Sequence, residues 1–195
     1  MKQIILASKS PRRKALLEQI GLKFTVDVSD IDESKYLHSN PESLAKSLSI
    51  AKAEKIAEKY KDAIIIAADT VVILNKEIIG KPKDKKDAVK MLRKLSGKTH
   101  VIITGFTILD TKTKKEITEF VQSKVRFKKM TGKEIDQYVK TGEPLEKAGC
   151  YGIQDKGAIF IEEVKGDFFN VVGLPIFALS QNLKKFGVDI ASVLI

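Results

Sequence analysis

The fold is organised around one stretch, Leu6-Ala7-Ser8-Lys9-Ser10-Pro11-Arg12-Arg13. The apolar residues 3–7 that lead into it predict a short buried strand. Ser10 is a suitable helix N-cap, and Pro11 suits the first helical turn, where its missing N–H costs no hydrogen bond. The helix that follows carries an apolar stripe and is closed by Gly21. This pattern predicts a strand, a tight turn and a helix.

A turn of small residues that leads into a helix with two arginines is typical of an anion-binding site. The unpaired N–H groups of the first helical turn and the helix dipole favour a phosphate there. Arg12 and Arg13 could both donate to its oxygens. The alternative is a capped surface helix with two solvated arginines, and this stretch alone leaves both interpretations open.

The composition is that of a globular protein of 195 residues, with 43% hydrophobic and 31% charged residues. No apolar run reaches the roughly 18 residues of a membrane span. The first residues lead directly into a strand and have no signal-peptide layout, so we expect a cytoplasmic protein without a membrane partner. One cysteine and two histidines exclude a disulfide framework and make a multi-histidine zinc site improbable.

A formal net charge of +10 indicates anionic partners such as nucleotides, nucleic acid or a membrane surface. The alternative is that many of these lysines lie on exposed helix faces and in turns. No RNA-binding aromatic signature or zinc finger accompanies the charge, so we do not expect nucleic acid as the partner.

The remaining patterns predict an α/β fold with a mixed, twisted sheet and flanking helices. Further helices are predicted after the N-caps Asn40, Asp84 and Thr131, and a last one from about Pro175. Strands are predicted at residues 23–28, 63–68, 71–74, 77–79, 99–109 and 116–127. Residues 158–164 and 168–172 predict one more hairpin, which turns at Lys165-Gly166-Asp167.

Four charged residues lack an obvious packing reason. Lys52 falls within the apolar arc of a helix, where it must extend to solvent or reach an anion. Lys81 stands at a Gly-Lys-Pro break, Glu33 lies in an acidic loop, and Asp69 ends a buried strand. Bases and acids of this kind suit a polyphosphate carried by a divalent cation. Taken singly, Asp69 is better explained as a strand-end salt-bridge partner or a turn former.

Other catalytic classes fit less well. No Gly-x-x-x-x-Gly-Lys-Ser/Thr loop is present, which excludes a Walker-type ATPase. Neither His38 nor His100 stands in a nucleophile-elbow context, and we expect His100 to be a structural hydrogen-bonding residue. Cys150 has no activating partner nearby in the sequence and is expected to be a small packing residue.

Together these segments resemble the Maf family of nucleoside triphosphate pyrophosphatases, which is associated with septum formation. The matching stretches occur in the family's order along essentially the whole chain: 7–13, 68–72, 80–82, 95–100, 141–144, 147–149, 151–154 and 172–175. The resemblance implies a Maf/inosine-triphosphatase-like fold in which residues 1–195 form a single domain, with two lobes around an active-site cleft. It also implies a homodimer.

The same resemblance implies a hydrolase of acid anhydrides. It would cleave a nucleoside triphosphate between the α- and β-phosphates with Mg²⁺ or Mn²⁺, releasing a monophosphate and pyrophosphate. Asp69 matches the catalytic proton acceptor, and with Glu33 it matches the metal site. The phosphate-binding positions correspond to Ser8, Arg13, Lys52 and Lys81.

Substrate choice is assigned by the resemblance to Arg12, Thr70 and Gln154. Tyr151-Gly152-Ile153-Gln154 resembles the branch that acts on dTTP and UTP, and modified pyrimidine triphosphates are further expected substrates. The resemblance also suggests a house-cleaning activity with a link to division arrest. The competing hypothesis is a non-enzymatic regulator of septum formation that senses nucleotides or binds nucleic acid.

Overall fold

The computed structural model describes residues 2–28, 30–36 and 40–193. The chain divides into two compact units. Unit 1 comprises Met1–Asp69, Thr104–Val121 and Gly173–Ile195, and unit 2 comprises Thr70–Ile103 and Gln122–Val172. The expectation for His38 lies outside the described residues, as does Ser29 of the acidic loop.

Over the described residues the strands form one mixed sheet of seven, in the order β2-β1-β3-β5-β6-β7, with β4 paired to β3. β1 pairs in parallel with β2 and β3, whereas β4 and β7 pair antiparallel with β3 and β6. The strands are β1 (Gln3–Ala7), β2 (Thr25–Asp27), β3 (Ala63–Leu74), β4 (Glu77–Ile79), β5 (Thr99–Asp110), β6 (Glu116–Phe127) and β7 (Ile161–Lys165). The mixed α/β fold class is therefore confirmed.

The core of unit 1 is built on the two most apolar strands. β1 and β3 lie in parallel register, with Ile5 opposite Ile65, and both side chains are fully buried. Continuous apolar runs of this kind are typical of strands covered on both faces. The helices of this unit are α1 (Pro11–Gln19), α2 (Pro41–Ala57) and α6 (Ile176–Lys184), with short 3₁₀ helices η1 (Glu33–Tyr36) and η5 (Ile190–Val193).

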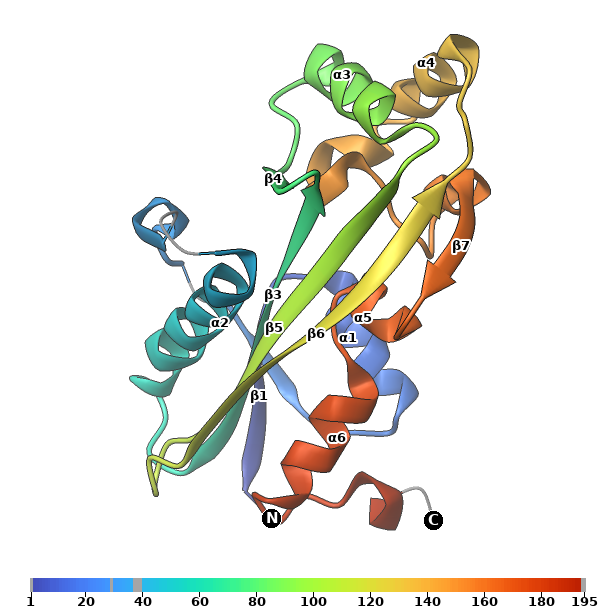
Figure 1. The fold of residues 1–195 in the computed structure, drawn as a ribbon. Coiled ribbons are helices and arrows are strands. Elements are labelled where there is room, and N and C mark those ends of the chain that lie inside the picture. Colours follow the sequence, from blue (N-terminus) through green and yellow to red (C-terminus); the bar gives the residue numbers. More distant parts are fainter. Residues whose placement is uncertain (1, 29, 37–39, 194–195) are drawn as a thin grey trace. The chain divides into compact units, whose positions relative to one another are not determined.

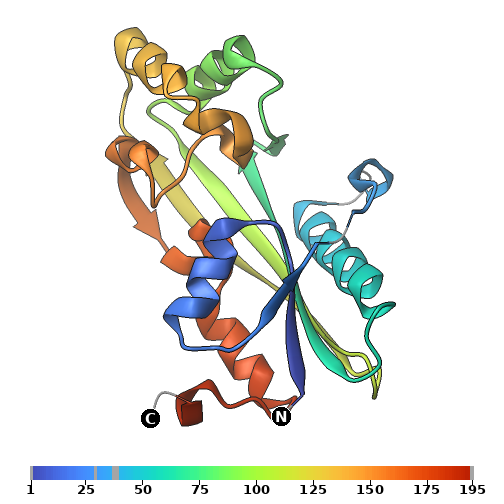
Figure 2. The ribbon, with the colours of Figure 1, turned by 180° about the vertical axis from the view of Figure 1, so that it is seen from behind.

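The helices of unit 1 cover opposite faces of its strands. α2 lies on one face, and α1 and α6 lie on the other (Figures 1 and 2). The approach of α2 to β5 is close at Gly105, where an added Cβ would lie 2.4 Å from the carbonyl carbon of Ala45. This position therefore needs glycine, because any side chain would collide with the helix backbone.

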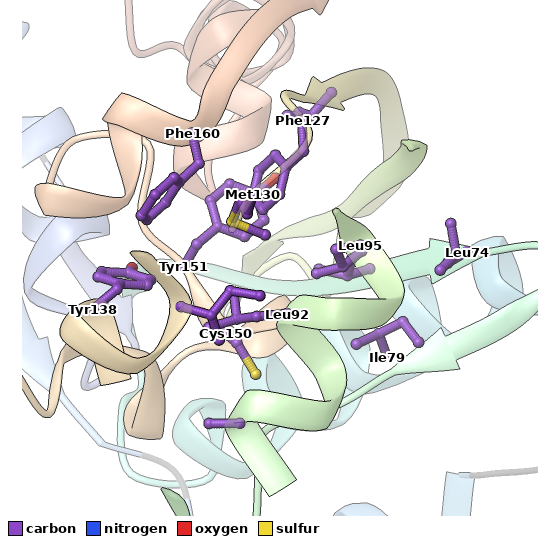
Figure 3. Close-up of a cluster of buried hydrophobic side chains, with 14 of the residues drawn as sticks. Leu74, Ile79, Leu92, Leu95, Phe127, Met130, Tyr138, Cys150, Tyr151 and Phe160 are labelled. Carbon is purple, nitrogen blue, oxygen red and sulfur yellow. The ribbon is translucent and has the colours of Figure 1, made fainter. Parts of the chain in front are cut away.

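Unit 2 has its own hydrophobic core, to which α3 (Lys85–Leu95) and α4 (Gly132–Lys140) contribute one face each. Figure 3 shows aliphatic and aromatic side chains of this core. The rings of Phe127 and Tyr151 meet edge to face with centroids 4.6 Å apart, and those of Tyr138 and Phe160 are 5.2 Å apart. The 3₁₀ helices η2 (Glu143–Glu146), η3 (Ala148–Cys150) and η4 (Lys156–Phe160) also belong to this unit.

The predicted caps and the central hairpin are confirmed. Ser10, Asn40 and Asp84 each accept a hydrogen bond from a main-chain N–H of the first helical turn. Thr131 and Glu134 form the reciprocal capping box that starts α4. The hairpin of β5 and β6 turns over residues 111–115, close to the predicted place.

The prediction of a second hairpin over residues 158–172 is wrong. Residues 161–165 form β7, which pairs with β6, but Phe168–Val172 form the short helix α5. The reason is local: Oδ1 of Asp167 accepts hydrogen bonds from the N–H groups of Phe169 and Asn170. A side chain that caps the following N–H groups starts a helical turn and not a returning strand.

None of the helices over the described residues has the length and apolar character that a membrane span requires.

Candidate active site

The turn after β1 is closed by serine hydroxyls. Oγ of Ser8 accepts hydrogen bonds from the N–H of Ser10, at 3.2 Å, and from the guanidinium of Arg13, also at 3.2 Å. Oγ of Ser10 caps α1 by accepting the N–H of Arg13. The turn thus presents the start of a helix beside a basic side chain, an arrangement that can bind an anion.

The guanidinium of Arg13 fastens this turn to two other segments of unit 1. Its Nε donates to the carbonyl of Gly173 at 2.8 Å, and one terminal nitrogen donates to the carbonyl of Ala68 at 2.7 Å. Burial lowers the pKa of Arg13, while the negative charge of Asp69 opposes that shift. Because Ala68 directly precedes Asp69, Arg13 fixes the backbone that carries the candidate base. Arg12 is half-buried beside it.

A lysine connects two carboxylates at the centre of the site. Nζ of Lys52 lies 2.6 Å from Oδ1 of Asp69 and 2.9 Å from Oε1 of Glu33. The Lys52 and Asp69 side chains are each 13% exposed, whereas Glu33 is 60% exposed. The sequence places Lys52 in an apolar helical arc and requires it to reach solvent or an anion, and the structure shows that it reaches two anions. These three charges come from α2, β3 and η1.

Asp69 and Glu33 fit a divalent cation of the magnesium type in the chemistry of their donors. Mg²⁺ is usually bound by one or two carboxylates, the remaining positions being filled by water and substrate phosphates. Over residues 2–28, 30–36 and 40–193, no group of three or more acidic, histidine or cysteine side chains could form a cage made of protein alone. Two carboxylates leave the other coordination positions of such a cation open to water and to substrate phosphates.

Three candidate residues belong to unit 2. Thr70 follows Asp69 along β3 and is half-buried, while Lys81 and Gln154 are exposed. The N–H of Gly149 donates to the carbonyl of Gly80 at 3.1 Å. This bond brings the Gly-Lys-Pro break next to the glycine-containing segment that leads to Gln154.

His100 and Cys150, which the sequence analysis did not expect to be catalytic, have structural roles. Nε2 of His100 lies 2.7 Å from the hydroxyl of Tyr151, which confirms it as a structural hydrogen-bonding residue. Cys150 is fully buried, and burial, helped by the charge of Asp87, raises its thiol pKa to about 12. A thiol with that pKa is not a nucleophile at neutral pH.

Sequence reasoning missed a second charged cluster. Glu143 and Lys147 stand in stretches that carry the family resemblance, but we gave them no role. In the structure Lys147 is buried between Glu143 and Asp155. The available signal was the presence of a lysine between Leu145 and Cys150, both apolar, since a lysine in an apolar segment needs an anionic partner.

The prediction that Asp69 ends a strand is wrong, because β3 continues without a break from Ala63 to Leu74 and carries Asp69 in its middle. These features define an α/β protein with an acid–lysine–acid site on a buried strand. Its fold is similar to that of a HAM1 protein from Coxiella burnetii, with a TM-score of 0.57 and 16% identity over 95% of this chain and 100% of that one. A family model described as Maf-like protein matches residues 3–186. The chain belongs to this family.

Its relatives match along nearly their whole length. A dTTP/UTP pyrophosphatase from Dictyoglomus turgidum is 46% identical over 95% of this chain and 97% of its own. A protein of the same name from Methanosarcina barkeri is 48% identical over 97% of both chains. A third, from Bacillus anthracis, is 46% identical over 97% of this chain and 98% of its own. The resemblance stated from the motifs is thereby confirmed.

Proposed function

We propose that this protein hydrolyses dTTP and UTP to the nucleoside monophosphate and pyrophosphate. The observation that carries the proposal is the placement of Lys52 between Asp69 and Glu33, which combines a candidate base with phosphate-binding charge. The names of its relatives support the same activity. A protein that merely binds phosphates would have no need of the Asp69 carboxylate on β3, because an anion is repelled by it.

Asp69 is the general base in this proposal. Its carboxylate accepts a proton from a water molecule, whose oxygen attacks the α-phosphorus. The bond from that phosphorus to the α,β-bridging oxygen breaks, and pyrophosphate leaves with the electron pair. The ammonium of Lys52, 2.6 Å from Asp69, orients the carboxylate and offers positive charge to the phosphates.

The turn after β1 holds the phosphates. Ser8 and the N–H groups at the start of α1 bind phosphate oxygens in this proposal, and Lys81 is a further proposed phosphate-binding residue. Arg13 contributes positive charge as well, but its hydrogen bonds to Ala68 and Gly173 make it above all the residue that fixes this turn to β3. Fixed donors lower the barrier more than mobile ones, because they need no reorganisation during the reaction.

A divalent cation, Mg²⁺ or Mn²⁺, is held by Asp69 and Glu33. When bound, it neutralises charge on the triphosphate and polarises the scissile phosphoryl group. Lys52 contacts both carboxylates and thereby keeps them together before the substrate arrives.

Base choice is assigned to Arg12, Thr70 and Gln154. The amide of Gln154 offers one acceptor and two donors, which suit the N3–H and carbonyl edge of uracil or thymine. Since dTTP and UTP differ in the 5-methyl group and the 2′-hydroxyl, neither group is tightly recognised. Modified pyrimidine triphosphates that keep this edge, such as pseudo-UTP and 5-methyl-UTP, are therefore also proposed substrates.

Three further expectations accompany the activity. We propose that residues 1–195 act as a single domain, that the protein forms a homodimer, and that it works in the cytoplasm as a house-cleaning enzyme with a link to division arrest.

A panel of nucleoside triphosphates, assayed for monophosphate and pyrophosphate with and without Mg²⁺ or Mn²⁺, tests the proposal. We expect dTTP and UTP to be hydrolysed fastest, and only with the metal. Binding of nucleotides without turnover under all conditions would instead support a non-enzymatic nucleotide sensor.

A further inference from the structure

Three charged side chains and one tyrosine form a partly buried group in unit 2, which includes Asp155, the residue after Gln154. We call it the Glu143 cluster, and it consists of Tyr138, Glu143, Lys147 and Asp155. Nζ of Lys147 lies 2.5 Å from Oδ2 of Asp155 and 3.3 Å from Oε1 of Glu143. The side chains of Lys147 and Glu143 are 9% and 12% exposed, whereas Asp155 is 41% exposed.

Glu143 is the centre of this cluster. Its carboxylate accepts hydrogen bonds from the Tyr138 hydroxyl at 2.7 Å and from two main-chain N–H groups, those of Lys156 at 3.1 Å and Gly157 at 3.2 Å. Burial by itself would raise the pKa of Glu143, but the Tyr138 hydroxyl, the Gly157 N–H and the Lys147 charge lower it. The ionised side chain therefore holds the backbone two residues beyond Gln154.

Two glycines leave the room that this cluster needs. A Cβ on Gly152 would lie 2.4 Å from Oδ2 of Asp155 and 2.9 Å from Nζ of Lys147. A Cβ on Gly157 would lie 2.6 Å from the Tyr138 hydroxyl oxygen. The segment 151–157 thus has its shape because side chains are absent at the two points where the charged groups approach it.

The other end of the same segment is also fastened. The Tyr151 hydroxyl is hydrogen-bonded to the buried His100 at 2.7 Å, and its ring packs against Phe127 in the core shown in Figure 3. Gln154 lies between this anchor and Asp155, and it is exposed to solvent. Buried groups therefore hold the segment on both sides of Gln154. We expect these groups to set the position of its exposed side chain.

We infer that Glu143 and Lys147 are positioning residues that set the place of the Gln154 amide and thereby the preference for a pyrimidine base. This inference rests on the proposed function, in which Gln154 reads the uracil or thymine edge. A buried pair of Glu143 and Lys147 contributes little to stability, since desolvation offsets much of the attraction between the two charges. Their value lies in fixing one conformation of the segment, as the hydrogen bonds to Lys156 and Gly157 show.

A double-mutant cycle between Glu143→Gln and Gln154→Ala tests the inference. The measured quantity is the affinity for α,β-methylene-UTP relative to α,β-methylene-ATP, by calorimetry, with kcat and KM for UTP alongside. Glu143→Gln should lower the preference for the uridine analogue about tenfold and raise KM more than it lowers kcat, because displaced positioning groups weaken binding. In the Gln154→Ala background the same change should have almost no further effect on the preference.

Glu146→Gln is the matched control, because Glu146 is an exposed acid of the same 3₁₀ helix and should leave the preference unchanged. If Glu143→Gln does not fold, Asp155→Asn replaces it in the cycle, since that carboxylate is more exposed. Additive losses, or an unchanged preference, would overturn the inference while leaving the proposed function intact. Failure of the unaltered protein to bind or hydrolyse the uridine nucleotides would overturn both.

Discussion

Nζ of Lys52, on α2, lies 2.6 Å from Oδ1 of Asp69, on β3. This pair couples the candidate base to the phosphate-binding charge. Replacing Lys52 with methionine keeps the apolar stem of the side chain but removes its charge, so we expect kcat for UTP to fall by about a hundredfold. Steady-state release of pyrophosphate measures the loss.

The matched control for this change is Lys55→Met on the same helix, because the Lys55 ammonium pairs with Glu58 and is half exposed. It should leave kcat unchanged. Equal losses for the two variants would show that the charge of the helix as a whole matters, and not the contact with Asp69.

Arg13 cannot be replaced by lysine without loss. A lysine has no planar fork and cannot donate at once to the carbonyls of Ala68 and Gly173. We expect Arg13→Lys to lower the free energy of unfolding by about 2 kcal/mol and to reduce kcat. Urea denaturation checks the first effect, with the exposed Lys14→Arg as the control. Unchanged stability would mean that these two hydrogen bonds contribute nothing measurable.

The close packing of α2 against β5 at Gly105 predicts how substitutions there change the stability of the fold. Gly105→Ala would place a methyl group 2.4 Å from backbone atoms of Ala45, so we expect a loss of about 3 kcal/mol or more in the free energy of unfolding. Gly132→Ala is the control, because Gly132 is the first residue of α4 and an added Cβ there has no neighbour within 4 Å. It should be neutral or slightly stabilising. Urea denaturation of both variants decides between close packing and a general intolerance of alanine.

His100 makes stability depend on pH. Burial lowers its pKa from the ordinary 6.5 to about 4. As the pH falls below 6.5, the unfolded chain takes up the proton before the folded one, so stability is lost between pH 6.5 and about 4. His100→Gln keeps a hydrogen-bonding group but does not titrate, and it should reduce this loss. Urea unfolding from neutral pH down to acid pH measures it, and identical profiles for the two proteins would contradict the prediction.

Local patterns were sufficient for much of this structure. Caps and apolar runs depend on neighbouring residues, which is why the strand at Gln3–Ala7 and the capping box at Thr131 could be predicted. The segment 168–172 could not, because its apolar composition suits a strand and the cap of Asp167 decides for a helix. Only the three-dimensional contacts reveal that Arg13 donates to Gly173, since the two residues are 160 positions apart.

The candidate site shows the same division. Lys52 could be predicted as a site residue because a lysine in the apolar arc of a helix must reach solvent or an anion. The identity of that anion depends on how α2 packs against β3, which the sequence does not show. The Glu143 cluster was overlooked because Glu143, Lys147 and Asp155 become partners only when three short helical turns bring them together. Motif matching could mark such stretches without giving their side chains a role.

The central claim is that water attacks the α-phosphorus of UTP with Asp69 as the base. The most direct measurement is hydrolysis of UTP in water enriched with a heavy oxygen isotope, followed by mass spectrometry of the products, for the unaltered protein and for Asp69→Asn. We expect the heavy oxygen in UMP and none in pyrophosphate, with turnover reduced about a thousandfold in Asp69→Asn. Heavy oxygen in the pyrophosphate, or near-normal turnover by Asp69→Asn, would contradict this mechanism.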